Sequence, residues 1–456
     1  MNLVYNIKDK PKFGQLIVFA FQQLLAILAA TIAVPTIVGN GMSQSAALFG
    51  AGVGTIVYLL FTKFNSPVFL GSSFAFIGSM LAAFAGAVSV EAGYAGIIFG
   101  AFFAGLVYVV IAIVVKFAGV GWIDKLMPAV VIGPTVSIIG LSLAGNAIGD
   151  LTTGKVLDAE GVSVASPYVA LICGLVTLFT VIICSVFGKK MAKLIPFIIG
   201  ILAGYVVAAV FTVIGIKTGN EALQVIDFSV FSGMKLFAVP DFSFLSAAKG
   251  IKAIGGKYIL TVAVAYVPVA FVVFAEHIAD HKNLSSVIGK ELLEDPGLHR
   301  TLLGDGVGSM VGAVFGGCPN TTYGESVGCV AITGNASVVT ILATAIMSMV
   351  ISFFGPFVTF LSTIPNCVMG GVCVTLYGFI AVSGLKMIQS VDLGENRNLF
   401  VVAVILICGI GGLTVSFGKV TLTEVACALI LGIVTNLIVG KKDKETADNT
   451  AEKVEK

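Results

Sequence analysis

Three acidic residues stand inside long apolar stretches of the chain, where a charge is costly. Glu276 and Asp280 lie four residues apart in the run VVFAEHIADHK, and Glu325 lies in GGCPNTTYGES between hydrophobic segments. Even permissive scales put the cost of a charged side chain near a bilayer centre at roughly 3 kcal/mol. A chain that keeps these carboxylates is therefore expected to build a polar site around them.

Glu276 and Asp280 are spaced by one helical turn, so both point from one face of a helix. Desolvation and mutual repulsion then favour one of the two acids keeping a proton, which suits a group that takes up and releases protons. The alternative for Asp280 is a solvated position at the cytoplasmic end of the helix, beside Lys282.

Glu325 follows Gly324 at the expected start of a half-helix, where the helix dipole favours a carboxylate. Alternatively, Glu325 caps the half-helix and binds no ligand. Asp305 follows the charged stretch DPGLHR and is interpreted as an interfacial cap. Phe74 and Tyr323 lie at two breaks in the apolar pattern, and this placement favours contact with a ligand as much as plain packing.

A different chemistry is indicated by the two histidines of His277-Ile278-Ala279-Asp280-His281. Their i and i+4 spacing with an acid between them resembles the HxxEH zinc motif of metalloproteases. However, Asp replaces Glu, His299 is the only other histidine, and His281 is expected at the water interface. An intramembrane metalloprotease is therefore a remote alternative, and we expect neither a metal nor a cofactor.

The composition indicates a polytopic membrane protein. The 456 residues are 57% hydrophobic and only 11% charged, whereas a soluble domain carries about 25% charged residues. The net charge of +2 gives no reason to expect a nucleic-acid partner. The eight cysteines lie in or beside apolar segments without a CxxC motif, which indicates buried thiols. The start, MNLVYNIKDKPKF, lacks the features of a cleaved signal peptide.

About fourteen stretches fit the roughly 20 mostly apolar residues that a membrane helix needs. They form two groups of seven on either side of a connection at 216–257, so the second group enters the membrane inverted. The predicted spans are 13–34, 45–62, 68–86, 94–115, 128–148, 167–188, 194–215, 258–281, 301–316, 320–333, 337–361, 367–388, 398–415 and 421–440.

The short loops indicate the orientation. Loops at alternate ends of the spans are basic, while the intervening short loops are uncharged or mainly acidic, and this bias places the basic loops in the cytoplasm. In the first half, the cytoplasmic lysines are Lys63, Lys116, Lys125, Lys189, Lys190 and Lys193. Both termini are then cytoplasmic, with 1–12 as the N-terminal segment and 441–456 as a disordered tail.

Two stretches, 69–74 (FLGSSF) and 319–323 (PNTTY), favour extended backbone inside the third and tenth spans. Extended chain in hydrocarbon must satisfy its N–H and C=O groups, so we expect the two stretches to pair with each other. Each would be followed by a half-helix whose free N–H groups face the middle of the membrane. Paired, interrupted spans in two inverted repeats indicate a transporter binding site. The alternative is that 68–86 and 320–333 are ordinary glycine-rich helices.

With its motifs AEHIAD, DPGLHRTLLGDGVG, GGCPNTTYGE and LGSSFAF, the chain resembles the nucleobase–ascorbate transporter family, and within it the bacterial uracil permeases. The resemblance implies an all-α fold of two inverted seven-span repeats, 13–215 and 258–440. It also implies a core domain (13–115 and 258–361) that moves against a gate domain (128–215 and 367–440), commonly in a homodimer.

The resemblance further implies the site. Glu276 and Glu325 would hold the base, with contacts from Phe74, Tyr323 and Gly324, while Glu276 and Asp280 would couple a proton. Further lining residues would be Gln22, Gln23, Ser73 and Tyr377. The chain departs from the family pattern at three places: Asp280 replaces the histidine of some uracil permeases, Gln22-Gln23 replaces a common Gln-His pair, and Ser326 replaces a frequent Asn.

These residue types suit a nucleobase, because carboxylates accept from its N–H groups and half-helix amides donate to its carbonyls. The expected function is proton-coupled symport of uracil across a bacterial plasma membrane. The alternatives are a xanthine, urate or other nucleobase carrier of the same family, and a passive anion channel, against which the acidic site argues.

Overall fold

The computed structural model describes residues 3–119, 122, 128–158, 160–189, 191–417 and 420–454. Lys125 and Lys190, which support the predicted orientation, lie outside the described residues.

The main helices of the first half are α1 (Phe13–Val38), α2 (Gln44–Phe61), η1 (Phe74–Phe76), α3 (Ile77–Gly86), α4 (Val90–Ala118), α6 (Ala129–Ser142), α7 (Ala144–Asp150), α8 (Pro167–Phe187), α9 (Met191–Leu194) and α10 (Pro196–Thr218). Those that follow are α11 (Ser243–Gly250), α12 (Gly256–Ile288), α13 (Leu298–Gly316), α14 (Gly324–Thr333), α15 (Val338–Ile351), α16 (Gly355–Thr363), α17 (Asn366–Ile388), α18 (Asn396–Ile410) and α19 (Glu424–Val454).

The fold is helical and multi-pass, as the sequence predicted. Within the described residues, eight helical segments are long and apolar enough to cross a membrane, and four shorter apolar helices accompany them. The eight are α1, α2, α4, α6 with α7, α8, α10, α12 and α17. The remaining predicted spans correspond to α13 and α14. The count of fourteen complete spans stays a prediction.

Two short strands interrupt the helices at the predicted places. β1 (Leu70–Ser72) and β2 (Asn320–Thr322) pair antiparallel, with Gly71 opposite Thr321. The backbone N–H of Ser73 extends the pairing by donating to the carbonyl of Pro319 at 2.9 Å. The half-helices η1–α3 and α14 follow the strands directly, so the alternative of two continuous glycine-rich helices is wrong.

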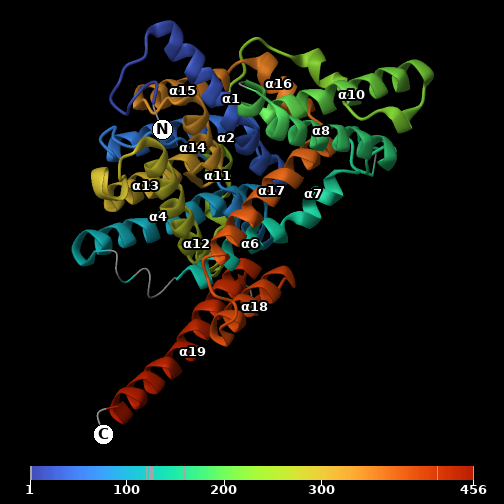
Figure 1. Cartoon of the computed structure of the whole chain (residues 1–456). Helices are drawn as coiled ribbons and strands as arrows, with labels where there is room; N and C mark the ends of the chain where they lie inside the picture. Colours follow the sequence, from blue (N-terminus) through green and yellow to red (C-terminus); the bar gives the residue numbers. More distant parts are fainter. Residues whose placement is uncertain are drawn as a thin grey trace.

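The helices pack in two groups (Figure 1). In the first, the core group, α13 packs against α2 and α4, α12 against α3 and α4, and α15 against α1 and α2. In the second, the gate group, α17 packs against α6, α7 and α8, α10 against α8, and α18 and α19 against α6. Contacts between the groups are sparser and come mainly from α1 and α12. The two groups contain the spans that the sequence analysis assigned to a core and a gate domain.

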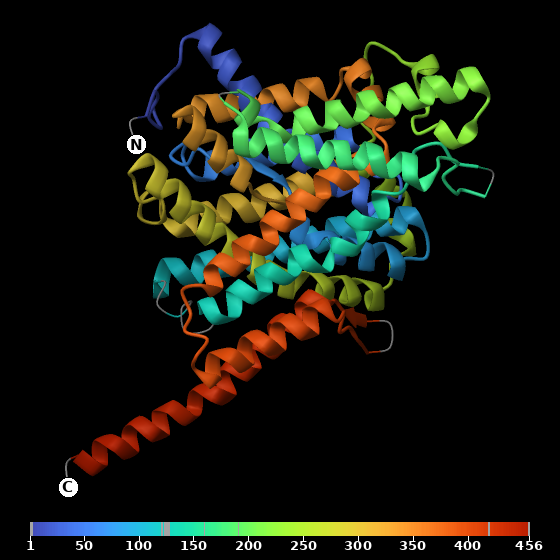
Figure 2. The same cartoon turned by 45° about the vertical axis from the view of Figure 1, so that its right-hand side comes forward.

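The loops separate into two opposite faces. On one face the N-terminal segment pairs with the α14–α15 loop, where Val4 N–H donates to Gly334 at 2.8 Å and Tyr5 accepts from Ala336 at 2.9 Å. On the other face Gly355 N–H donates to Leu236 of the long connection at 3.0 Å. Figure 2 shows both chain ends toward one side and the hairpin of β3 (Val415–Phe417) and β4 (Val420–Leu422) toward the other.

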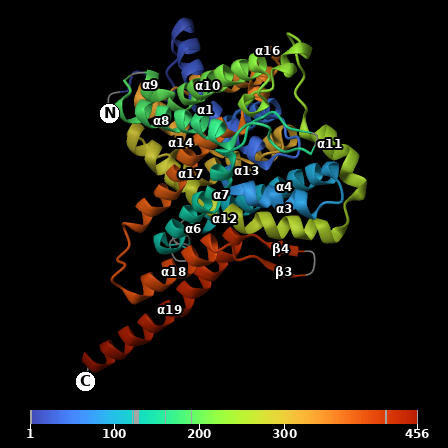
Figure 3. The ribbon, with the colours of Figure 1, turned by 90° about the vertical axis from the view of Figure 1, so that its right-hand side faces the viewer.

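Two elements differ from the sequence expectations. The β3–β4 hairpin occupies the link between the last two predicted spans, and β4 packs against α12 (Figure 3). The backbone of α19 continues as a helix to Val454, where the sequence analysis expected a disordered tail from residue 441. Lys, Glu and Ala favour helix, and extending an existing helix requires no new nucleus.

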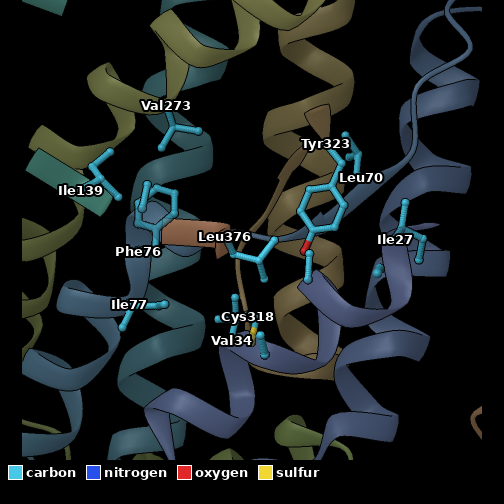
Figure 4. Packing of buried hydrophobic residues seen from close by; sticks show 14 of the residues in the cluster. Ile27, Val34, Leu70, Phe76, Ile77, Ile139, Val273, Cys318, Tyr323 and Leu376 are labelled. Atoms are coloured by element: carbon cyan, nitrogen blue, oxygen red, sulfur yellow. The ribbon is translucent and has the colours of Figure 1, made fainter. Parts of the chain in front are cut away.

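Apolar side chains from both repeats fill the space around the strand pair (Figure 4). Leu70 and Phe76 come from the first repeat, and Val273 and Tyr323 come from the second. The ring of Phe76 also stacks on that of Tyr266, with 5.4 Å between the ring centroids. The strand pair is therefore held by packing on both sides as well as by its hydrogen bonds.

Candidate functional site

A cavity of about 430 Å³ lies between the core group and the gate group, at the level of the strand pair. Its volume falls in the range of small-molecule sites. The core group contributes Ala26, Ser73, Phe74, Ala75, Glu276, Ala279, Asp280, Thr321, Thr322, Tyr323, Gly324, Glu325, Gly328, Cys329 and Ile332. The gate group contributes Val136, Ile139, Ser185, Lys193, Leu194, Pro196, Phe197, Leu376, Phe379, Ile380, Ser383 and Met387.

The three acids that the sequence singled out line this one cavity. Glu276 and Asp280 project from α12, Glu325 stands in the first turn of α14, and all three are half-buried. Thr322 of β2 donates its hydroxyl to Oδ2 of Asp280 at 2.8 Å. Asp280 is therefore held against the strand pair, and the alternative of a solvated helix end is wrong.

Both chain breaks also face the cavity. Ser73, Phe74, Tyr323 and Gly324 line it where η1 and α14 begin, and the first N–H groups of a helix have no partner within it. Tyr323 is fixed by its hydroxyl, which donates to the carbonyl of Ser72 at 2.8 Å. The buried hydroxyl of Ser73 has no hydrogen-bond partner in the described part of the chain. The site thus offers donors beside the acceptors of the three carboxylates.

Three residues that the sequence analysis expected to line the site lie outside the cavity wall: Tyr377, Gln22 and Gln23. The ring of Tyr377 stands behind Phe74, edge to face, with 6.0 Å between the centroids. Gln22 donates to the sulfur of Met191 at 3.1 Å. These two residues are placed to support the wall rather than to form it.

Gln23 is buried and donates its side-chain amide to Oγ of Ser326 at 2.6 Å. The same hydroxyl accepts from the backbone N–H of Phe69 at 3.2 Å. Two of the departures from the family pattern, at residues 23 and 326, are therefore in direct contact. Together they tie α1 to the start of α14 and to the segment before β1.

Asp305 is not an interfacial cap, which corrects the sequence interpretation. It is 1% exposed, and its Oδ2 lies 2.7 Å from Nδ1 of His277. The other ring nitrogen of His277 lies 3.0 Å from the hydroxyl of Thr301. The charged stretch before Asp305 suggested a surface position, but that stretch ends at the start of α13, and Asp305 lies two turns further into the core.

His281 is also buried, which contradicts its predicted place at the water interface. Its Nδ1 lies 2.8 Å from the carbonyl oxygen of His277, and its Nε2 lies 2.7 Å from the hydroxyl of Tyr58, which donates to Ser66. All four imidazole nitrogens of the HIADH motif are therefore engaged in hydrogen bonds, one within α12 and three that fix α12 against α2 and α13. This arrangement explains the histidine spacing without a zinc ion.

The gate side of the cavity was missed by sequence reasoning. Leu376, Phe379, Ile380 and Ser383 of α17 lie at i, i+3, i+4 and i+7, so they form one helix face toward the acids. The spacing was visible in the sequence, but an apolar face of a membrane helix looks the same whether it meets lipid or a ligand. Among the described lining residues, Lys193 is the only basic one, and its side chain is exposed.

The fold and the cavity between two helix groups define the class of protein as a membrane transporter. The family model Xan_ur_permease, described as a permease family, matches residues 14–417. The chain belongs to this family, the nucleobase–ascorbate transporters.

Similar curated proteins cover nearly the whole chain. The uracil permease of Bacillus caldolyticus is 40% identical over 96% of this chain and 94% of its own length. The uracil permease of Bacillus subtilis is 37% identical over 98% and 97%, and that of Escherichia coli K12 is 33% identical over 95% and 93%.

Solved structures support the fold. The transmembrane domain of the cyanobacterial bicarbonate transporter BicA matches with a TM-score of 0.64 at 16% identity, over 95% of this chain and all of that one. The murine anion transporter Slc26a9 matches with a TM-score of 0.64 at 12% identity, over 96% of this chain and 69% of that one. At such low identity the likeness concerns the fold alone.

Proposed function

We propose that this protein takes up uracil together with protons across a bacterial plasma membrane. The observation that carries the proposal is the convergence of Glu276, Asp280 and Glu325, from α12 and α14 of the second repeat, on one cavity beside the strand pair that joins the two repeats. The uracil permeases that match this chain over nearly its full length support the choice of base.

The cavity provides the groups that a uracil edge requires. Uracil alternates N–H donors with carbonyl acceptors, so Glu276 and Glu325 accept from the N–H groups, while the amides at Phe74 and Gly324 donate to the carbonyls. The apolar face of α17 covers the ring. Charge-assisted hydrogen bonds in such a secluded site supply both affinity and orientation.

The coupled proton follows from the same acids. Carboxylates that share a small cavity do not all stay ionised at low cost, so at least one carries a proton. Asp280, held by Thr322 beside Glu276, is placed to exchange that proton as the base binds. The proton gradient then drives accumulation of the neutral base.

The direction of opening suggests which state the structure represents. Ser185, Lys193 and Met387 line the cavity near the ends of α8, α9 and α17, and the exposed side chain of Lys193 indicates an opening at these ends. If the basic loops are cytoplasmic, this state is open to the cytoplasm. We propose that the core group moves against the gate group to expose the same site to the other side, commonly within a homodimer.

The experiment is uptake of labelled uracil into proteoliposomes that hold purified protein. We expect accumulation under an inward proton gradient and its collapse with a protonophore. Unlabelled xanthine and urate serve as competitors, and stronger competition by them than by unlabelled uracil would move the substrate to the purines. Flux that neither saturates nor depends on the proton gradient would favour a passive channel and would sink the symport proposal.

A further inference from the structure

A second, much smaller space adjoins the site. Its volume is about 10 Å³, which is room for roughly one water molecule. Phe74, Ala75 and Ile139 line both this space and the main cavity, so the two are neighbours that share one wall. The small space therefore continues the main cavity beyond Phe74.

The direction of this continuation follows from the helices around it. Gly78 lies beyond Phe74 along α3, and Ser142 lies beyond Ile139 along α6, in both cases toward the helix end that the predicted orientation places outside. Thr423 and Glu424 close the space from the start of α19, directly after the β3–β4 hairpin. Core elements thus form one side of the space, and gate elements form the other.

Glu424 is the acid of this space, and its carboxylate has no hydrogen bond or ion pair with any described residue. The absence of a side chain at Gly78 leaves room for it, since a Cβ built there would lie 3.6 Å from Oε1 of Glu424. A half-buried carboxylate without a protein partner is costly unless water or a ligand hydrogen-bonds to it. Its position between the two helix groups places it on the path that opens when they separate.

We propose that this space is the closed outer entrance of the substrate route, and that Glu424 is the first carboxylate to accept from an N–H group of the incoming base. The inference rests on the proposed function. Phe74 then separates two binding sites for the base: an outer one at Glu424 and the main one at Glu276 and Glu325. The hydroxyls of Ser142 and Thr423 supply further polar contacts at the outer binding site.

The first test asks whether the space opens to the outside. Gly78→Cys is sterically tolerated, because its Cβ meets only the carboxylate of Glu424 at ordinary contact distance. We expect a membrane-impermeant methanethiosulfonate reagent, added outside cells, to label this cysteine and to lower uracil uptake at least tenfold. Saturating uracil should slow the labelling at least threefold. Gly86→Cys, at the exposed end of the same helix, is the matched control and should be labelled at the same rate with or without uracil.

The second test isolates Glu424. We expect Glu424→Gln to raise the KM for uptake from outside about tenfold, while the Kd of uracil for the purified protein changes less than twofold. An equal rise in both constants would mean that Glu424 acts on the main site or on the fold, and would overturn the proposal. The proposal would also be overturned if Gly78→Cys stayed unlabelled in cells in which the wild-type protein takes up uracil. Absence of uracil uptake by the wild type would instead defeat the proposed function, while external labelling of Gly78→Cys would still report the entrance.

Discussion

At the scale of single residues, the two glutamates of the site come from two different helices of the second repeat. Glu276 comes from α12 of the core group and Glu325 from the first turn of a half-helix, yet both line the same cavity. A hydrogen bond to a charged group contributes about 1.5–3 kcal/mol, which is roughly 10- to 150-fold in affinity. Each glutamate is therefore expected to be needed separately.

We expect Glu276→Gln and Glu325→Gln each to lower gradient-driven uracil accumulation by about 10- to 100-fold. The substitution keeps the shape of the side chain but removes the charge and presents an NH₂ donor to a base N–H. Uptake into proteoliposomes is the measurement, and Glu160→Gln in an exposed loop is the matched control. Full accumulation by either site variant would remove that acid from the site.

The buried pair of Asp305 and His277 stabilises the helix that carries two of the acids. Asp305→Ala leaves a fully buried imidazole without a partner on Nδ1, which costs about 1–3 kcal/mol. We expect a lower midpoint of thermal unfolding in detergent, and a smaller decrease for Asp305→Asn, whose carbonyl still accepts. Unchanged unfolding of the alanine variant would show that the pair contributes nothing to stability.

At the scale of elements, the strand pair β1–β2 positions both half-helices, and its geometry depends on one small residue. The ring of Tyr323 occupies the place that a Cβ of Gly71 would take. We therefore expect Gly71→Ala to displace Tyr323, to break its bond to Ser72 and to abolish most uracil uptake. Gly86→Ala, whose Cβ would meet a ring of Tyr258 at 3.6 Å, is the matched control in the same repeat.

Both breaks were predictable from the sequence because their residue types disfavour helix and because extended backbone in lipid must find a partner. FLGSSF and PNTTY lie in equivalent spans, so their pairing followed from the inverted repeat. Local chemistry therefore located the strands, the half-helices and the three acids of the cavity.

The gate wall was not predictable in the same way. Leu376 and Phe379 belong to an apolar helix, and only the packing of α17 across the cavity distinguishes their face from a lipid-facing one. The burial of Asp305 was missed for a related reason, since its partner His277 lies 28 residues away in the sequence. Such pairings depend on how distant helices meet, which no local pattern specifies.

At the scale of the whole molecule, the site is divided unequally between the two helix groups. The acids, the strand pair and both half-helices belong to the core group, whereas the gate group supplies mainly apolar cover. Hydrogen bonds such as that between Tyr323 and Ser72 lie within the core group, so this group carries the three acids and the groups that hold them in place. A movement of the core group past the gate group would therefore carry the base without dismantling its site.

The place where the two groups meet around the small outer space provides a way to arrest that movement. Gly78 of the core group and Glu424 of the gate group face each other across the small outer space. We expect a short thiol cross-linker to join Gly78→Cys to Glu424→Cys, to stop uracil uptake, and to release it again on cleavage by a reductant. Comparing the same double variant before and after cleavage cancels any effect of losing the carboxylate.

The matched control joins two helices of the gate group. Ser137 of α6 donates to the carbonyl of Ala381 of α17 at 3.0 Å, so a link between Ser137→Cys and Ala381→Cys restrains no movement between the groups. Uptake should persist after this second link forms. If the link across the groups leaves uptake intact, the two groups do not move apart at this place during transport; if both links stop uptake, the gate group itself changes shape.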